Sequence, residues 1–377
     1  MKEINDIIRA YETALQNGYS MALATVVKVE GSSYRQPGAR MLVTEDGNLT
    51  GAISGGCLEG DALRKALLAI HQQKNKLITY DTSNEDNTEF GVQLGCNGIV
   101  HILFEFIDTD NANNPLALLK KLQADRKEAV IVTLFSTKHR DMQRGTILLA
   151  DKGGNVFDPS SDIDLSVLEE DIHRAREEKQ HYLKKLFRQG QELEALIEYV
   201  APAINLVIVG AGNDAKPLVG AADLLGWDTT IIDGRATHAL LQRFPKAKQV
   251  ILSTADQVAS VVKIDPFTVF VLMTHNYHYD LAVLKLLIGT VTPYIGVLGP
   301  KTKLQRMFDD LETAGIILNE RQKERIYGPM GLDIGAETSE EIAISVVSEV
   351  KAILRRRSGG PLKFLKRKIH EDIPIIP

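Results

Sequence analysis

Two thiols are the side chains of this chain with the most evident chemistry, and both stand beside glycines. Cys57 follows Ser54-Gly55-Gly56 and precedes a run with the apolar spacing of a helix, whereas Cys96 lies in Gly95-Cys96-Asn97-Gly98 before a predicted strand. The positive end of a helix dipole favours a thiolate, and a thiolate is both a nucleophile and a soft metal ligand. We therefore take Cys57 and Cys96 as candidate catalytic or cofactor-binding thiols; the alternative is that both are buried structural residues.

Groups that bind anions surround the first thiol in the sequence. Backbone amides beside Gly55 and Gly56 can form a concave anion site. Arg35 and Arg40 lie nearby, as does Glu59. A guanidinium group holds phosphate or carboxylate through two parallel hydrogen bonds. We expect Arg40 to contact an anionic ligand; the alternative is an ordinary surface arginine.

A second group of residues has the spacing of a dinucleotide-binding loop. The run LVIVGAGNDA gives a strand, a turn and a helix start, with Gly210, Gly212 and Ala215 at the positions of the fingerprint. The first glycine permits the turn, the second lets a pyrophosphate approach the backbone, and Ala215 allows close packing of helix on strand. We predict a cofactor site that includes Asn213 of the same loop; the alternative is that the glycines serve only the turn.

The acidic partner of that loop is Asp233, which ends the next predicted strand roughly twenty positions later, as the fingerprint requires. Its carboxylate is expected to accept hydrogen bonds from ribose hydroxyls. Arg235 follows closely and has two interpretations: a contact to a 2′-phosphate, or an exposed arginine in a salt bridge.

Three further polar residues follow a later predicted strand. His275, His278 and Asp280 stand after residues 268–273, at a carboxyl end of the sheet, where such folds bind ligands. We expect them to line the pocket, with His275 in contact with the cofactor; the alternative is that they cap the next helix. The glycine-rich run at 328–335 leads to Thr338 and Glu341, which have capping-box spacing, and is a further potential anion site; the alternative is a loop shaped by packing alone.

Two blocks of predicted secondary structure position these residues. The first begins with a helix over residues 1–16, includes a helix from Cys57 to about Gln73, and ends with a charged helical stretch from Ser166 to about Val200. Ser166 and Glu169 have the spacing of a capping box at the start of that stretch. Its predicted strands cover residues 21–29, 40–44, 48–54, 77–81, 99–107, 129–135 and 146–150.

The second block alternates strands and helices, which is the pattern of a parallel sheet with right-handed crossovers. Its predicted strands cover residues 206–209, 229–233, 250–253, 268–273 and 294–298. The predicted fold class is therefore α/β: an N-terminal mixed α/β domain over residues 1–200 and a Rossmann-type doubly wound parallel sheet over residues 201–357. Residues 358–377 form a tail that we expect to dock or to remain flexible.

Composition narrows the functional classes. The 377 residues are 44% hydrophobic and 25% charged, with a net charge of −5, which is unfavourable for binding a nucleic acid backbone. No apolar run approaches the roughly 18 residues of a membrane span, and the N-terminus lacks the apolar core of a signal peptide. Two cysteines are too few for a disulfide framework. We expect reduced thiols and a cytoplasmic location.

With these residues considered, the chain resembles the xanthine dehydrogenase accessory protein family, also called the XdhC/CoxI family. The segments that carry the resemblance are GSSYRQPGARMLVTEDGNLTGAISGGCLEGDAL at 31–63, IYGPMGLDIGAETSEEIAISVVSEV at 326–350, and residues 91–105, 206–235 and 294–303. The resemblance implies a role in maturing molybdenum hydroxylases: binding the molybdenum cofactor, assisting the exchange of an oxo for a sulfido ligand, and passing the cofactor to the apoenzyme. It makes Cys57 a candidate cofactor contact; beside Cys96, Asn97 stands where the family has glycine.

The partners implied are an apo molybdenum hydroxylase and a cysteine desulfurase, and we expect a homodimer. Two alternatives remain open: an NAD(P)-dependent oxidoreductase with His275 or His278 as acid/base, and a non-catalytic nucleotide-sensing module. A xanthine dehydrogenase in its own right is disfavoured, because that family carries two iron–sulfur clusters of four thiolates each and this chain has two cysteines.

Overall fold

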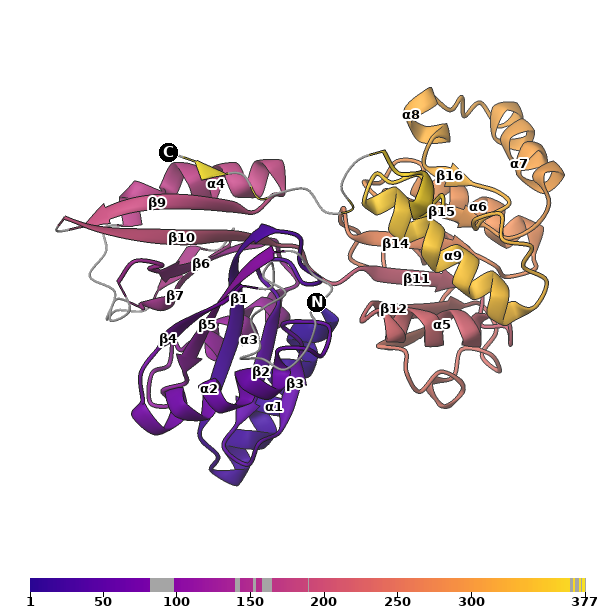
Figure 1. Cartoon of the computed structure of the whole chain (residues 1–377). Coiled ribbons are helices and arrows are strands. Elements are labelled where there is room, and N and C mark those ends of the chain that lie inside the picture. The colour runs from indigo at the N-terminus through magenta and orange to yellow at the C-terminus, as the bar shows by residue number, and fades with distance from the viewer. Residues whose placement is uncertain are drawn as a thin grey trace. The chain divides into compact units, whose positions relative to one another are not determined.

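The chain folds into two compact units (Figure 1). The structure is a computed structural model that describes residues 1–81, 98–139, 143–151, 154–157, 165–188, 190–366, 369, 373 and 375–376. Unit 1 comprises Met1–Pro202 with His370–Pro377, and unit 2 comprises Ala203–Ile369. Cys96 and Asn97 lie outside the described residues.

The first sheet of unit 1 is antiparallel, with the order β3-β2-β1-β5-β4. Its strands are β1 (Met21–Gly31), β2 (Arg40–Thr44), β3 (Leu49–Gly51), β4 (Lys76–Asp81) and β5 (Gly98–Phe106), and its helices are α1 (Lys2–Asn17) and α2 (Glu59–Gln72). The face of α2 that carries Ala62, Ala66 and Ala69 is buried against this sheet. These small side chains let the helix approach closely, which fixes where its N-terminus and the Cys57 loop lie.

The second sheet of unit 1 has the order β17-β9-β10-β6-β7-β8. Its strands are β6 (Ala129–Phe135), β7 (Gly145–Asp151), β8 (Gly154–Phe157), β9 (Tyr182–Arg188), β10 (Gln191–Val200) and β17 (Ile375–Ile376), and its helices are α3 (Pro115–Asp125) and α4 (Glu169–Glu178). Every pair is antiparallel except β17 with β9, where Ile375 lies opposite Leu183. The end of the tail therefore joins the sheet of unit 1.

The prediction of a helix from Ser166 to Val200 was wrong beyond Glu178. Among the described residues of this stretch, α4 is the only α-helix; two strands, β9 and β10, follow it. The charges that favoured a solvated helix belong in part to a buried strand, since Glu194 and Glu198 are 4% and 6% exposed. The predicted capping box is also absent, because Leu168 occupies the N-cap of α4 and makes no side-chain capping bond.

The two sheets of unit 1 share a core that contains ion pairs as well as apolar side chains. Val27 and Leu103 from the first sheet pack with Phe135 and others from the second. Within the same unit, the Arg40 guanidinium donates to both carboxylate oxygens of Glu198, at 2.9 and 2.6 Å, and only 1% of Arg40 is exposed. Each partner offsets part of the desolvation of the other, and the pair joins β2 of the first sheet to β10 of the second.

Unit 2 is a doubly wound sheet of parallel strands, in the order β13-β12-β11-β14-β15-β16. Its strands are β11 (Asn205–Val209), β12 (Asp228–Asp233), β13 (Gln249–Leu252), β14 (Thr268–Leu272), β15 (Ile295–Val297) and β16 (Ile326–Tyr327). Its helices are α5 (Ala215–Leu224), α6 (Tyr277–Leu287), α7 (Lys301–Thr313), α8 (Glu320–Lys323) and α9 (Ser339–Leu354). The predicted Rossmann-type sheet is confirmed.

Alternate residues of β11 face opposite layers of helices. Leu206 and Ile208 lie in one core with α5 and α9, whereas Val207 and Val209 lie in the other with α6 and α7. Such continuous apolar strands are typical of a parallel sheet covered on both faces. Among the residues described, no helix is both long enough and apolar enough to cross a membrane.

We expect Glu198→Ala to lower the free energy of unfolding by about 3–5 kcal/mol, because it leaves the Arg40 charge buried without a partner. Urea denaturation followed by circular dichroism measures the loss. A matched control is Lys138→Ala, which breaks the pair with Glu192 at a side chain that is 62% exposed and should cost less than about 1 kcal/mol. Equal losses in the two variants would contradict a buried, mutually dependent pair.

A second prediction concerns Glu105 on β5, which is 1% exposed and accepts hydrogen bonds from the amide and hydroxyl of Thr146. Burial raises the pKa of Glu105 to about 7, above its ordinary value of 4.5, although Thr146 and Arg40 oppose the shift. The folded state therefore holds this proton more tightly than the unfolded state, and its stabilising effect is lost as the pH rises from 4.5 to about 7.

Relative to Glu105→Gln, which does not titrate, the wild type should lose up to about 3 kcal/mol of unfolding free energy across that interval. Urea unfolding of both proteins at a series of pH values gives the difference directly. Parallel curves for the two proteins would show that Glu105 does not titrate in this range.

Candidate functional site

The Cys57 loop of unit 1, residues Ser54 to Glu59, closes on itself immediately before α2. The Ser54 hydroxyl oxygen accepts hydrogen bonds from the amides of Gly56 and Leu58, each at 3.1 Å. The Glu59 carboxylate accepts from the Ser54 amide at 3.0 Å and also from the Ser54 hydroxyl. Ser54 and Glu59 therefore organise the loop; Glu59 was noted in the sequence only as a neighbour, and its organising role was missed.

This loop presents Cys57 to solvent. Gly55, Gly56 and Cys57 are all exposed, and α2 begins two residues later at Glu59. Gly56 has a φ of +106°, and a Cβ atom placed on Gly55 would lie 3.5 Å from the ring of Tyr34. Within the described part of the chain, the amides of Gly55 and Cys57 donate to no acceptor. A thiol and two N–H donors are thus available to a ligand.

The two arginines predicted near this loop are used inside unit 1. Arg35 donates to Glu3, and the buried Arg40 is paired with Glu198 and also donates to the carbonyl of Gly38 at 2.9 Å. Arg40 is therefore neither an anion-binding group facing a ligand nor a surface arginine, and both predictions for it were wrong. The sequence could not reveal the partner, because Glu198 lies on a strand that was predicted as a helix.

In unit 2, Gly210 follows β11 in a turn that only glycine fits. Its φ is +124°, and a Cβ atom there would lie 2.4 Å from the carbonyl oxygen of Met273. Ala215 is fully buried at the start of α5. At Gly212, a Cβ atom would lie 2.2 Å from Oδ1 of Asp214. The space over Gly212 through which a pyrophosphate would approach is thus occupied by the chain's own carboxylate.

Asp233 has the position expected of a ribose contact, but its oxygens are engaged within the chain. Oδ2 accepts from the amide of Ala211 at 2.7 Å, and Arg235 donates to both oxygens. Burial by itself would raise the pKa of Asp233; the hydrogen bonds from Arg235 and Ala211 outweigh it and hold the pKa below its ordinary value. Arg235 is 49% exposed at its side chain and forms the salt bridge that was one of its two interpretations.

The three polar residues after β14 do not converge on one point. Nε2 of His275 lies 2.8 Å from Oδ2 of Asp214, while His278 is exposed. Asp280 is buried and accepts from the Thr274 hydroxyl at 2.6 Å and from Lys303 at 2.8 Å. No group of three or more metal-ligating side chains occurs among the residues that the structure describes.

Two neighbouring residues complete this loop region. The side-chain oxygen of Asn213 accepts from Arg243 at 3.0 Å. The helix after β14 is capped by Asn276, whose side chain accepts from the amide of Tyr279. The N-cap of α6 is therefore a residue that the sequence analysis did not name.

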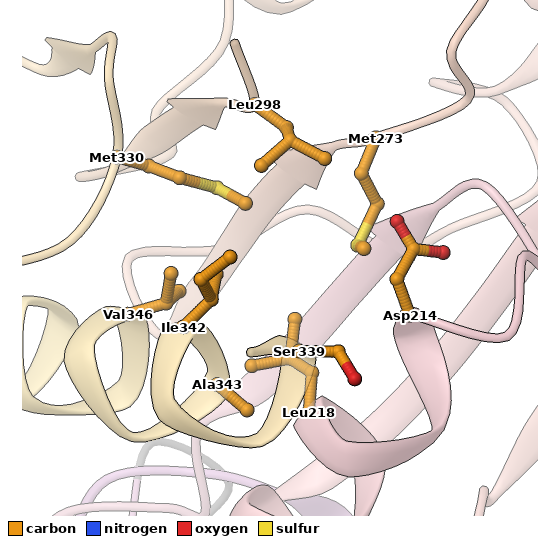
Figure 2. A pocket seen from close by; sticks show the side chains of 9 residues that line it. All are labelled: Asp214, Leu218, Met273, Leu298, Met330, Ser339, Ile342, Ala343 and Val346. Carbon is orange, nitrogen blue, oxygen red and sulfur yellow. The ribbon is translucent and has the colours of Figure 1, made fainter. Parts of the chain in front are cut away.

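A cavity of about 100 Å³ lies at the carboxyl ends of β11, β14 and β15, where the direction of winding reverses (Figure 2). Seven of its side chains are apolar and two are polar; the lining consists of Asp214, Leu218, Met273, Leu298, Met330, Ser339, Ile342, Ala343 and Val346. None of His275, His278 and Asp280 is among them. Asp214 does line the cavity, although the sequence analysis gave it no role. The feature of the sequence that could have indicated this role is the presence of an acidic residue inside the glycine loop.

The glycine-rich run after β16 forms one wall of this cavity. Met330 lines it, and the amide of Gly331, whose φ is +106°, donates to Glu349 of α9 at 2.9 Å. At the start of α9 the predicted capping box is present, since Thr338 and Glu341 each accept from the other's backbone amide. The run is thus held by α9, and the N-terminus of that helix opens beside the cavity.

Comparison with known proteins gives two family matches and several relatives. Residues 14–81 match a family described as XdhC and CoxI, and residues 206–350 match one described as the XdhC Rossmann domain. The chain is 30% identical to a protein of Bacillus subtilis that is named as a probable subunit of xanthine dehydrogenase, over 90% of this chain and 94% of that protein.

Two further proteins are similar over nearly the whole chain. A molybdenum cofactor insertion chaperone of Escherichia coli, PaoD, is 24% identical over 92% of this chain and 87% of its own length. A crystal structure described as a xanthine dehydrogenase from Bacillus halodurans aligns with a TM-score of 0.74 and 28% identity, covering 95% of this chain and 99% of that one.

The glycine loop of unit 2 yields a paired prediction. Gly210→Ala should lower the free energy of unfolding by about 2 kcal/mol or more, because both its positive φ and a backbone carbonyl oppose a side chain. Gly212→Ala should cost less than about 1 kcal/mol, because the obstructing atom is the end of the Asp214 side chain, which can rotate away. Urea denaturation followed by the fluorescence of Trp227, in the core of unit 2, measures both. A larger loss for Gly212→Ala would contradict the placement of Asp214.

Proposed function

Because this chain belongs to the XdhC and CoxI family, we propose that it is an accessory protein that matures a molybdenum hydroxylase. In this role it binds the molybdenum cofactor as cargo and delivers it to the apoenzyme. The observation that carries the proposal is the Cys57 loop, which presents an exposed thiol beside two available amides before α2.

The relatives support this role through what their names state. PaoD is named as a molybdenum cofactor insertion chaperone, and the alignment with it extends through both units. The match over residues 14–81 includes the whole Cys57 loop and α2. Maturation of a molybdenum enzyme is therefore the function that the similarity favours.

The chemistry of the Cys57 loop suits this cargo. The cofactor offers a soft molybdenum–dithiolene centre, a pterin and a phosphate. A thiolate matches the soft centre, and the amides of Gly55 and Cys57 match an anionic group. In our proposal Cys57 contacts the cofactor, and Cys96 contributes a second thiol.

The finer steps are also part of the proposal. The protein assists the exchange of an oxo for a sulfido ligand, has a cysteine desulfurase among its partners, and acts as a cytoplasmic homodimer. Two cysteines cannot ligate two iron–sulfur clusters of four thiolates each. We therefore assign the chain a role beside a dehydrogenase and not the dehydrogenase reaction itself, although two relatives bear that name.

The alternative of an NAD(P)-dependent oxidoreductase is less favoured by the geometry. A dinucleotide needs the approach over Gly212 and the oxygens of Asp233. The Asp214 side chain lies in the space over Gly212, and Arg235 donates hydrogen bonds to both oxygens of Asp233. The same two contacts disfavour a nucleotide-sensing module that reads a dinucleotide.

The test is retention of molybdenum by the purified full-length chain after anaerobic addition of molybdenum cofactor and gel filtration, measured by elemental analysis. We expect stoichiometric retention by the wild type and a loss of about tenfold or more in Cys57→Ala, since the variant removes the soft ligand. The matched control is Arg64→Ala on the exposed surface of α2, where the side chain is 73% exposed, and it should retain the wild-type amount.

Three results are decisive. Loss in Cys57→Ala with retention in Arg64→Ala supports the proposal. Equal retention in both variants removes Cys57 from the site and makes Cys96→Ala the next variant. No retention by the wild type would rule out the carrier function.

A further inference from the structure

The stretch that follows α9, residues 355–366, is exposed along its whole length and is called the basic segment below. Its sequence is RRRSGGPLKFLK, and each of these residues is exposed. The basic segment belongs to unit 2. It passes close to the body of that unit at Gly359, where a Cβ atom would lie 3.1 Å from the side chain of Leu332. The backbone is thus placed against unit 2 while the side chains face solvent.

The charge of the basic segment has one sign. It holds five basic residues and no acidic residue, in a chain whose net charge is −5. Within the described part of the chain, no ion pair is formed by Arg355, Arg356, Lys363 or Lys366. Nζ of Lys363 lies 4.8 Å from the centre of the Phe364 ring. Cations so close in the sequence repel one another, and an anionic surface would relieve that repulsion.

The end of α9 accounts for only a part of this charge. The amides of Arg356 and Arg357 donate to the carbonyls of Ile353 and Ala352, at 3.0 and 2.8 Å, and Arg356 has a φ of +52°. This is a helix end of the kind that usually has glycine in the left-handed position. A helix C-terminus favours nearby cations, but its effect fades within a turn and does not extend to the lysines at 363 and 366.

Large apolar side chains lie between these cations. Leu362, Phe364 and Leu365 are 63%, 71% and 37% exposed. Leu362 and Phe364 belong to a single turn of 3₁₀ helix, Leu362–Phe364, which buries neither of them. Exposed apolar side chains that lie next to one another mark sites of contact with a protein or a membrane.

We propose that the basic segment binds the surface of an anionic lipid bilayer. Its arginines and lysines contact the headgroups, and Phe364 enters the boundary between headgroups and acyl chains together with Leu362 and Leu365. A bilayer surface offers both contacts at once, because negative charge and an apolar layer lie within a side chain's length of each other. The attachment is peripheral and reversible, since it uses one short segment.

Two other anionic partners fit the basic segment less well. Nucleic acid phosphates would pair with the cations, but they offer nothing to the aliphatic side chains of Leu362 and Leu365. A protein interface requires close shape complementarity, whereas the basic segment contains two glycines, a proline and a single turn of helix. A fluid bilayer accepts such a segment in many conformations. Both alternatives are outcomes of the test.

This inference goes beyond the proposed function and does not rest on it. Molybdenum retention depends on the Cys57 loop of unit 1, and lipid binding depends on a segment of unit 2. Either property can fail while the other is observed.

The experiment is sedimentation of the full chain with vesicles of phosphatidylcholine alone, or of phosphatidylcholine and phosphatidylglycerol in equal parts. We expect binding to the anionic vesicles only. Binding should weaken by about tenfold or more between about 0.1 M and about 1 M salt, because the Debye length falls from about 10 Å to about 3 Å.

The double variant Lys363→Ala with Lys366→Ala tests the charges. It should weaken binding to the anionic vesicles by about tenfold or more, since each basic side chain near such a surface contributes about fivefold. The matched control is Lys246→Ala with Lys248→Ala, also in unit 2, where the two side chains are 62% and 60% exposed. It changes the net charge equally and should bind within about twofold of the wild type.

Phe364→Ala tests the apolar contact. It should weaken binding by about fivefold, because the ring no longer enters the bilayer boundary. The matched control is Phe187→Ala on β9, a phenylalanine that is 75% exposed, and its affinity should equal that of the wild type. The midpoint of thermal unfolding of each variant shows that the fold is retained.

Loss of binding in both basic-segment variants, with binding kept in both controls, supports the proposal. It is overturned if the wild type does not bind anionic vesicles, if it binds phosphatidylcholine vesicles as tightly, or if either basic-segment variant matches its control. Tighter binding to duplex DNA or to polyglutamate than to the anionic vesicles also overturns it, and would assign the basic segment to a nucleic acid or to an acidic protein.

Discussion

β11 pairs with β12 on one side and with β14 on the other, and all three strands run in the same direction. β13 is the edge strand beyond β12, whereas the next strand in the sequence, β14, lies on the other side of β11. The chain must therefore cross the sheet between β13 and β14, and no loop connects the carboxyl end of β11 to that of β14. This position is the topological switch point, at which open α/β sheets bind ligands. The glycine loop, Asp214, Met273 and the apolar cavity all occupy it as a consequence of strand order.

Unit 1 meets a different constraint, because two sheets must share a core that includes charge. Arg40 is buried and depends on Glu198, which lies 158 positions away in the sequence. Lys28 and Glu194 form a similar pair at 3.0 Å. These pairs join the two sheets, whereas the Cys57 loop at the surface is organised by short-range bonds from Ser54 and Glu59. Structural charge and the candidate reactive group are thus separated within one unit.

The sequence allowed prediction wherever the determinant was local. Glycine spacing, apolar alternation and the Thr338–Glu341 cap identified the Rossmann-type sheet and the start of α9, and the Ser-Gly-Gly-Cys run identified the exposed loop before α2. Where the determinant was a distant partner, prediction failed. Glu198 had the pattern of a solvated helix until its contact with Arg40, 158 positions away in the sequence, was visible. Spacing within a loop specifies a turn but does not show which side chain occupies the space above it.

The pairing of β17 with β9 has a topological consequence. The backbone leaves unit 1 after Pro202, forms all of unit 2, and returns so that Ile375 and Ile376 align with Leu183 and Lys184. Unit 2 is thereby an insertion with both of its ends anchored in unit 1. Scission of the backbone near residue 202 would leave unit 2 attached through that final strand, so separation of the Cys57 loop from the cavity of unit 2 requires both a broken peptide bond and the loss of the pairing between β17 and β9.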